Sequence, residues 1–118
     1  MLGGVALQFF LAGLGAFGAT SIGPHAMLGT LLALLGLVLL ILAAVAKAKV
    51  GPTAALFGLL VLQILLPEIG KGLSAPVISA LHPVNAVLVL GTAHHVARGI
   101  PGGGSATAER PAARSRVA

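Results

Sequence analysis

Two histidines near the mouths of apolar segments are the side chains best suited to hold a ligand. His25 follows Pro24 and His82 precedes Pro83, and a long apolar run comes after each. Ionisable side chains are costly in spanning segments, so they are interpreted first as functional. Two neutral imidazoles without a thiolate suit haem iron in a helix bundle. Zinc or copper would want a third or fourth ligand, and only Glu68 is a candidate at that depth.

Each histidine also has a structural interpretation, because a neutral imidazole near the membrane interface can reach water or cap a turn. His94 and His95 form a second pair, but adjacent residues on a helix point about 100° apart and do not share one site. They follow His82 by roughly 18–20 Å along a helix. The second segment has no histidine near its end to act as their partner. We therefore interpret them as interfacial residues near Arg98.

Small residues share a helical face with each of the two leading histidines. Gly29 and Gly36 fall on the face of His25, and Ala86 falls on the face of His82. Two such stripes facing each other leave room for a flat ligand, or they let the helices close together. The predicted site therefore places one haem b between the second and fourth helices, with His25 and His82 as its metal ligands.

Two polar residues complete this predicted site. Asn85 follows His82 by one turn and is placed to orient that imidazole or to bond a neighbouring backbone. Lys71 is placed to meet haem propionates, with plain solvation as the alternative. Gln8 and Gln63 lie in the apolar interior, where a buried amide needs partners. We expect them to bond across helices, with the lining of a ligand or quinone pocket as the alternative.

The composition indicates that a membrane holds these residues in place. Of the 118 residues, 58% are hydrophobic and 8% are charged, and the mean hydropathy is +1.10. A soluble domain has about 25% charged residues. We predict an all-α integral membrane four-helix bundle over residues 1–98, with a kink or end of the third segment at Pro67, a loop over 68–79 and Pro83 in the first turn of the fourth segment. The predicted helices are 2–22, 25–46, 53–69 and 80–97.

The bundle is predicted to consist of two pseudo-repeated helical hairpins. Gln8 and Gln63 are 55 positions apart, as are Gly15 and Gly70, and the two leading histidines are 57 apart. The second hairpin therefore has a turn two residues longer. This repeat predicts that the two imidazoles lie at equal depth in the membrane, on opposing walls of one cavity.

The distribution of charge predicts the topology. The net charge is +5, yet the basic residues flank apolar segments, which argues against nucleic acid and favours the lipid bilayer as partner. With four spans, all basic residues except Lys71 fall on one side, which is expected to be cytoplasmic in a cell membrane, with both termini inside. Residues 99–118 are rich in Gly, Ala, Pro, Ser and Arg, and we predict a disordered basic tail.

The sequence lacks the residues that several kinds of catalytic or metal site require. The chain has no cysteine, so it has no thiolate for a zinc or iron–sulfur site. It contains neither a phosphate-binding loop nor a dinucleotide fingerprint, and no paired carboxylates for acid–base catalysis. A self-contained hydrolase or transferase is not expected.

The stretches 62–66 and 81–86, with Gln63 and the His82-Pro83-x-Asn85 motif, resemble the third and fourth helices of one half of the haem A synthase family. The chain is still more similar to a group of small, uncharacterised four-helix membrane proteins with the same pattern. The resemblance implies that His25 and His82 coordinate one haem. The chain is half as long as a haem A synthase and lacks a carboxylate in the first outer loop, which leaves enzymatic activity open.

These observations leave three functional hypotheses. The first is a membrane protein with one b-type haem that transfers electrons or senses or stores haem, with a membrane redox partner. The second is a haem-free structural, accessory or assembly subunit of a membrane complex. The third is a small transporter, which the scarcity of intramembrane charge disfavours. A homo-oligomer through the small-residue face around Gly15 and Ala19 is compatible with each of them.

Overall fold

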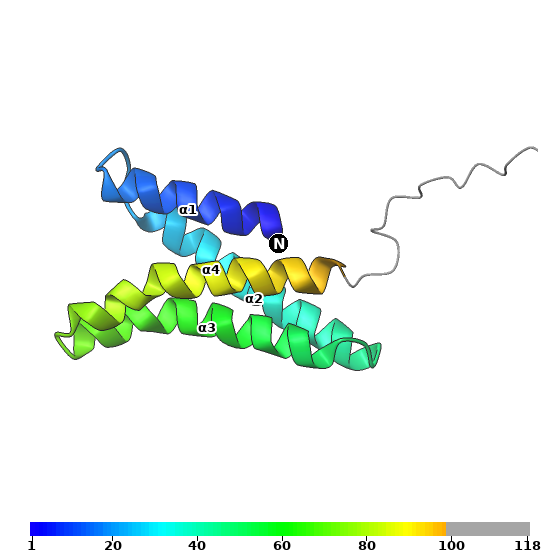
Figure 1. Cartoon of the computed structure of the whole chain (residues 1–118). Coiled ribbons are helices and arrows are strands. Elements are labelled where there is room, and N and C mark those ends of the chain that lie inside the picture. Colours follow the sequence, from blue (N-terminus) through cyan, green and yellow to red (C-terminus); the bar gives the residue numbers. More distant parts are fainter. Residues whose placement is uncertain (99–118) are drawn as a thin grey trace, which may run out of the picture.

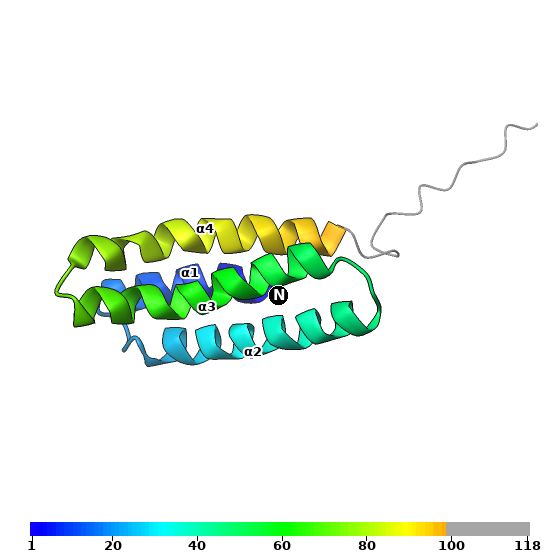
Figure 2. The same cartoon turned by 90° about the horizontal axis from the view of Figure 1, so that it is seen from below.

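Four helices run side by side with alternating direction (Figure 1) in a computed structural model that describes residues 1–98. Each helix packs against the next, and α1 also packs against α4, so the four close into a ring in which α2 lies diagonal to α4 (Figures 1 and 2). Residues 1–98 contain no strand, and the predicted all-α four-helix bundle is confirmed. The predicted tail lies outside the described residues. The helices are α1 (Leu2–Ala16), α2 (Gly23–Val45), α3 (Val50–Gly72) and α4 (Pro76–Arg98).

Three of the helices are long and apolar enough to cross a membrane. Each of α2, α3 and α4 has 23 residues, and such a helix is about 34 Å long, against about 30 Å for the hydrocarbon core of a bilayer. The outer surface of the bundle is formed by exposed leucine, isoleucine and valine side chains. Helix α1 is also apolar but has only 15 residues. The described helices have the character of an integral membrane protein.

The first helix is shorter than predicted because Gly18 ends it. Gly18 adopts a left-handed φ of 72°, and its N–H donates to the Gly15 carbonyl while that of Ala19 donates to the Leu14 carbonyl. This pattern is the Schellman motif, which closes a helix at a left-handed residue. The prediction of a helix over 2–22 is therefore wrong, and α1 ends at Ala16.

The same motif ends α2 and α3, but with residues other than glycine. Lys47 after α2 has φ 50° and Ser74 after α3 has φ 52°. The Ala48 N–H bonds the Ala43 carbonyl at 3.0 Å, and the Ala75 N–H bonds the Gly70 carbonyl at 2.8 Å. Neither end has the glycine that usually marks this motif in a sequence.

The predicted loop over 68–79 is also wrong. Helix α3 continues through Pro67 to Gly72, and α4 begins at Pro76. A proline is favourable as the first residue of a helix, so Pro76 is the start signal. Pro83, predicted in the first turn, lies inside α4 instead.

The internal repeat is visible in the core. Three pairs of corresponding positions are buried in both hairpins, at spacings of 55 for the first helices and 57 for the second helices. Apart from Gly36, which lies against Leu60, they pack together in one apolar cluster around Leu56, which is 1% exposed. The corresponding buried pairs are Val5 and Leu60, Leu32 and Val89, and Gly36 and Ala93.

Each hairpin also closes at a corresponding glycine. A Cβ placed on Gly15 would lie 3.0 Å from Cδ1 of Ile22, and a Cβ on Gly70 would lie 2.7 Å from the backbone nitrogen of Ser79. Of the residues named for the predicted oligomer face, Gly15 lies against Ile22 of its own chain and Ala19 lies beyond the end of α1. The oligomer itself stays a prediction. The chain before α2 approaches α1 closely at Gly15, and α4 approaches α3 closely at Gly70. These contacts help to set how α2 and α4 lie along their partner helices.

Candidate functional site

The two leading histidines meet in the centre of the bundle. His25 on α2 and His82 on α4 have ring centroids 5.8 Å apart and ring planes inclined by 62°, an edge-to-face arrangement. Both side chains are partly buried. Helices that are diagonal in the ring therefore bring the two predicted ligands to the same depth.

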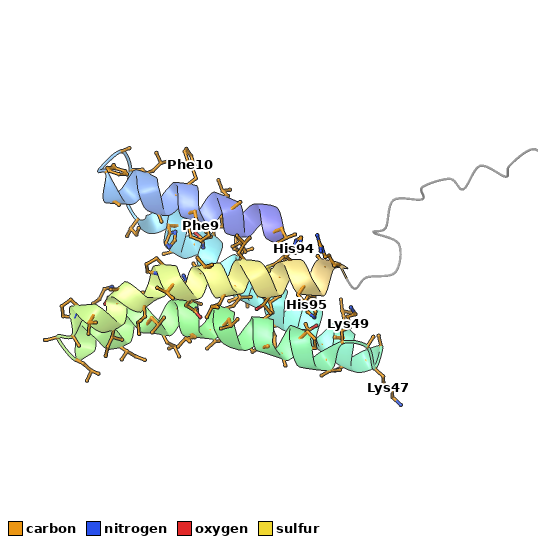
Figure 3. All side chains as sticks on the ribbon, viewed as in Figure 1. Phe9, Phe10, Lys47, Lys49, His94 and His95 are labelled. Carbon is orange, nitrogen blue, oxygen red and sulfur yellow. The ribbon has the colours of Figure 1, made fainter. Side chains whose placement is uncertain are left out.

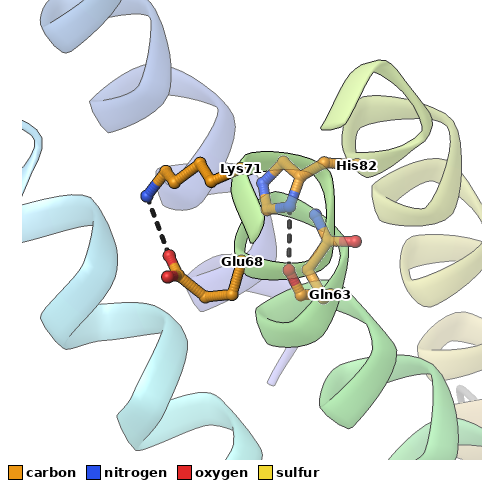
Figure 4. A network of polar contacts seen from close by, with 4 residues as sticks. All are labelled: Gln63, Glu68, Lys71 and His82. Atoms are coloured by element: carbon orange, nitrogen blue, oxygen red, sulfur yellow. Dashed lines mark hydrogen bonds and ion pairs between the residues drawn. The ribbon is translucent and has the colours of Figure 1, made fainter. Parts of the chain in front are cut away.

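Each imidazole is fixed by a hydrogen bond to the backbone of the preceding helix. His25 Nδ1 lies 3.0 Å from the Gln8 carbonyl oxygen, and His82 Nδ1 lies 2.8 Å from the Gln63 carbonyl oxygen (Figure 4). A carbonyl oxygen only accepts, so Nδ1 is the donor in both bonds. In a neutral imidazole the lone pair is then on Nε2, which is the nitrogen left free to bind a metal or another donor.

Asn85, one turn after His82, joins α4 to α3. Its side chain is 4% exposed, and its Nδ2 donates to the Leu59 carbonyl at 2.9 Å and to the Gln63 Oε1 at 2.6 Å. Of the two predicted roles for Asn85, bonding to a neighbouring backbone is the one observed. Within residues 1–98, Oδ1 of Asn85 and Oε1 of Gln8 are buried without a partner.

Replacing Asn85 with alanine should weaken the packing of α4 on α3. The change removes both bonds that Asn85 makes to α3, and interhelical bonds in membrane proteins contribute about 0.6–2 kcal/mol each. We expect the free energy of unfolding, measured by denaturant titration in mixed micelles, to fall by about 1–4 kcal/mol. Thr30→Ala is the control, because the Thr30 hydroxyl bonds the Ala26 carbonyl of its own helix. Equal losses in the two variants would contradict the role of Asn85.

A cavity of about 600 Å³ opens beside the histidines, between all four helices. Ligand sites commonly have volumes of roughly 300–1,000 Å³. Its walls are mainly apolar and include both imidazoles together with Gly29 and Ala86. Gly36 is not part of this wall and lies against Leu60, whose Cδ1 would be 2.6 Å from an added Cβ.

Lys71 reaches the cavity from α3, not from the predicted loop. Its Nζ forms an ion pair with Glu68 Oε1 at 2.8 Å (Figure 4), and both side chains are largely exposed to the surroundings. Both residues line the cavity. An exposed ion pair contributes only about 0–1 kcal/mol, so Lys71 can leave Glu68 for an anionic ligand group at small cost.

The second pair of histidines lies away from this site. His94 and His95 are exposed near the end of α4, at the same end of the bundle as Lys47 and Lys49 (Figure 3). Neither lines the cavity. Their surroundings agree with the interfacial interpretation, and we call this end, with these four residues and Arg98, the basic end.

The sequence did not reveal the acceptors that hold the site. Gln8 and Gln63 stood out for their side-chain amides, whereas the histidines use their backbone carbonyls. The Leu59 carbonyl accepts a hydrogen bond from Asn85. The sequence could not indicate it, because every residue type has a backbone carbonyl. The spacing shared by the glutamines and the histidines was the usable signal, since it predicted which helices would face each other.

One family model matches the chain. Residues 8–69, more than half of the chain, match the model of DUF6220, a family of unknown function. The chain belongs to DUF6220. In this DUF6220 protein the match contains Gln8, His25 and Gln63, whereas His82 lies beyond it. Neither the curated proteins nor the solved structures include a match to it.

Proposed function

We propose that this integral membrane protein binds one b-type haem through His25 and His82. The observation that supports the proposal most directly is the imidazole pair, with ring centroids 5.8 Å apart beside one cavity. Imidazole nitrogens bind first-row metals at about 2 Å, so two rings on opposite sides of one metal ion have centroids roughly 6 Å apart. The spacing therefore suits a metal centre that both histidines would hold through Nε2.

A porphyrin would explain why two protein ligands are sufficient. Among residues 1–98, no three His, Cys, Asp or Glu side chains gather where they could hold a bare metal ion. Haem iron is already held by its porphyrin and takes only axial ligands from the protein. The apolar walls of the cavity would suit the ring, and Lys71, which lines the cavity, would pair with the propionates. The resemblance of 62–66 and 81–86 to one half of haem A synthase agrees with this proposal.

Bound haem would supply one-electron chemistry, and the same site would serve a protein that senses or stores haem. The role of this chain would be to present both imidazoles with Nε2 free and to exclude water with the apolar walls of the cavity. We therefore propose electron transfer or haem handling with a membrane redox partner or a second copy of the chain.

The basic end supports a proposed orientation. Lys47, Lys49 and Arg98 lie at the end of the bundle opposite the Glu68–Lys71 pair. Positive charge favours the cytoplasmic side of a membrane. The basic end would then face the cytoplasm across a cell membrane, and the histidines would lie toward the outer face.

The test is a spectrum of the protein purified in detergent after haem supply. We expect a Soret band with the sharp reduced bands of bis-histidine haem. Replacing both His25 and His82 with alanine should abolish it, because both axial ligands are removed. His94→Ala with His95→Ala is the matched control, since these residues lie outside the cavity, and it should bind haem like the parent. An absent band, or a band unchanged by replacing His25 and His82, would refute the proposal.

A haem-free structural or assembly subunit is the second candidate, and a specific observation favours it. The two imidazoles already contact each other edge to face, and each already bonds a neighbouring helix. In that case the pair would serve to join the four helices. The double alanine variant would then lower the free energy of unfolding, whereas haem supply would leave the parent protein without a Soret band.

A further inference from the structure

Pro67 creates an acceptor inside α3. In an α-helix the N–H of each residue donates to the carbonyl four residues earlier, and proline has no N–H. The carbonyl deprived of its usual donor by Pro67 is that of Gln63. This is the carbonyl that lies 2.8 Å from His82 Nδ1.

We infer that Pro67 is a positioning residue that reserves the Gln63 carbonyl for His82. The proline removes the competing donor from the ladder of α3, and the imidazole of α4 supplies the missing hydrogen bond. In a bilayer a freed carbonyl needs a partner from a neighbouring helix. The same bond that satisfies α3 therefore fixes the tautomer and the direction of the His82 ring.

The first hairpin lacks this device. At the spacing of 55 that relates the first helices of the two hairpins, Pro67 corresponds to Ala12. Ala12 lies within α1 and keeps an N–H for the Gln8 carbonyl, so His25 shares its acceptor with the helix. The longer bond of His25, 3.0 Å against 2.8 Å for His82, has the direction expected for a shared acceptor.

The two imidazoles are therefore unequal. An imidazole with a stronger Nδ1–H bond to a carbonyl is a more basic ligand through Nε2. His82 is the firmly held and stronger donor, and His25 is the more easily displaced one. This consequence for a ligand rests on the proposed haem site, whereas the role of Pro67 in holding His82 does not.

The experiment is ¹⁵N NMR of the histidine rings in the haem-free full-length protein in micelles, comparing the parent with Pro67→Ala. The restored N–H at position 67 competes for the Gln63 carbonyl, so exchange of the His82 Nδ1 proton should become about tenfold faster, the equivalent of one hydrogen bond. The His25 signals should stay unchanged. Pro52→Ala is the control, because Pro52 lies in the first turn of α3, where N–H groups lack intrahelical acceptors in any case.

Unchanged exchange at His82 in Pro67→Ala, or an equal change at His25, would overturn the inference. A second measurement follows haem binding by the same variants. If the NMR change appears but no variant takes up haem, the role of Pro67 stands and the haem proposal fails. If haem binds and Pro67→Ala leaves both the proton exchange and the haem affinity unaltered, the haem proposal stands and the role of Pro67 fails.

Discussion

In the proposed haem site, replacing Gly29 with leucine should abolish haem uptake while the bundle stays folded. Gly29 lines the cavity one turn after His25, and its missing side chain leaves part of the cavity open. A Cβ there would lie 2.8 Å from Nε2 of Gln8, the end of a flexible side chain that can move aside. Leucine is also a better helix former than glycine by roughly 0.8 kcal/mol. The substitution should therefore fill the site without unfolding the protein.

The measurement is a haem titration followed by the Soret band, with helicity as the check on folding. Gly58→Leu is the matched control, because Gly58 is an exposed glycine of α3 with no atom within 4 Å of an added Cβ. It should bind haem like the parent. A Gly29→Leu variant with parental haem affinity would show that the ligand, if any, binds elsewhere.

Two glycine-to-alanine substitutions at the end of α3 should change stability in opposite directions. Gly70→Ala places a methyl group against the backbone nitrogen and hydroxyl of Ser79, where backbone leaves little room to relax. Overpacking of this kind costs about 1–3 kcal/mol. Gly72→Ala meets nothing within 4 Å and should gain about 0.5–1 kcal/mol, since alanine loses less backbone entropy in a helix.

The free energies of unfolding of both variants, measured in mixed micelles, test this prediction. Because Ser79 lies on α4 three residues before His82, Gly70→Ala should also disturb the His82 Nδ1 bond to Gln63, which ring NMR detects. Equal stabilities of the two variants would mean that the α3–α4 hairpin does not depend on close approach at Gly70.

The helices and their pairing were predictable because long apolar runs and a repeated spacing have few alternatives in a membrane. The repeat placed His25 and His82 on facing helices, and these helices do bring the rings together. Helix ends were predicted less well. Pro67 was predicted to end or kink its helix and Pro83 to lie in a first turn, but both lie inside their helices. Neighbouring helices can satisfy the carbonyls that a proline frees.

Two other features had weak signals or none. Gly18 marks the end of α1 by its φ of 72°, but it stands in a segment full of small residues that also suit helix packing. Lys47 and Ser74 end their helices in the same way, and neither residue type indicates a left-handed turn. The carbonyls that hold the histidines are backbone groups, so only the packed structure identifies them.

The turn between α2 and α3 carries backbone strain at two residues. A residue other than glycine in the left-handed region costs roughly 1–2 kcal/mol, and both Lys47, with φ 50°, and Lys49, with φ 52°, lie there. The packing of α2 on α3 must outweigh this cost, so weakening that packing should release this turn.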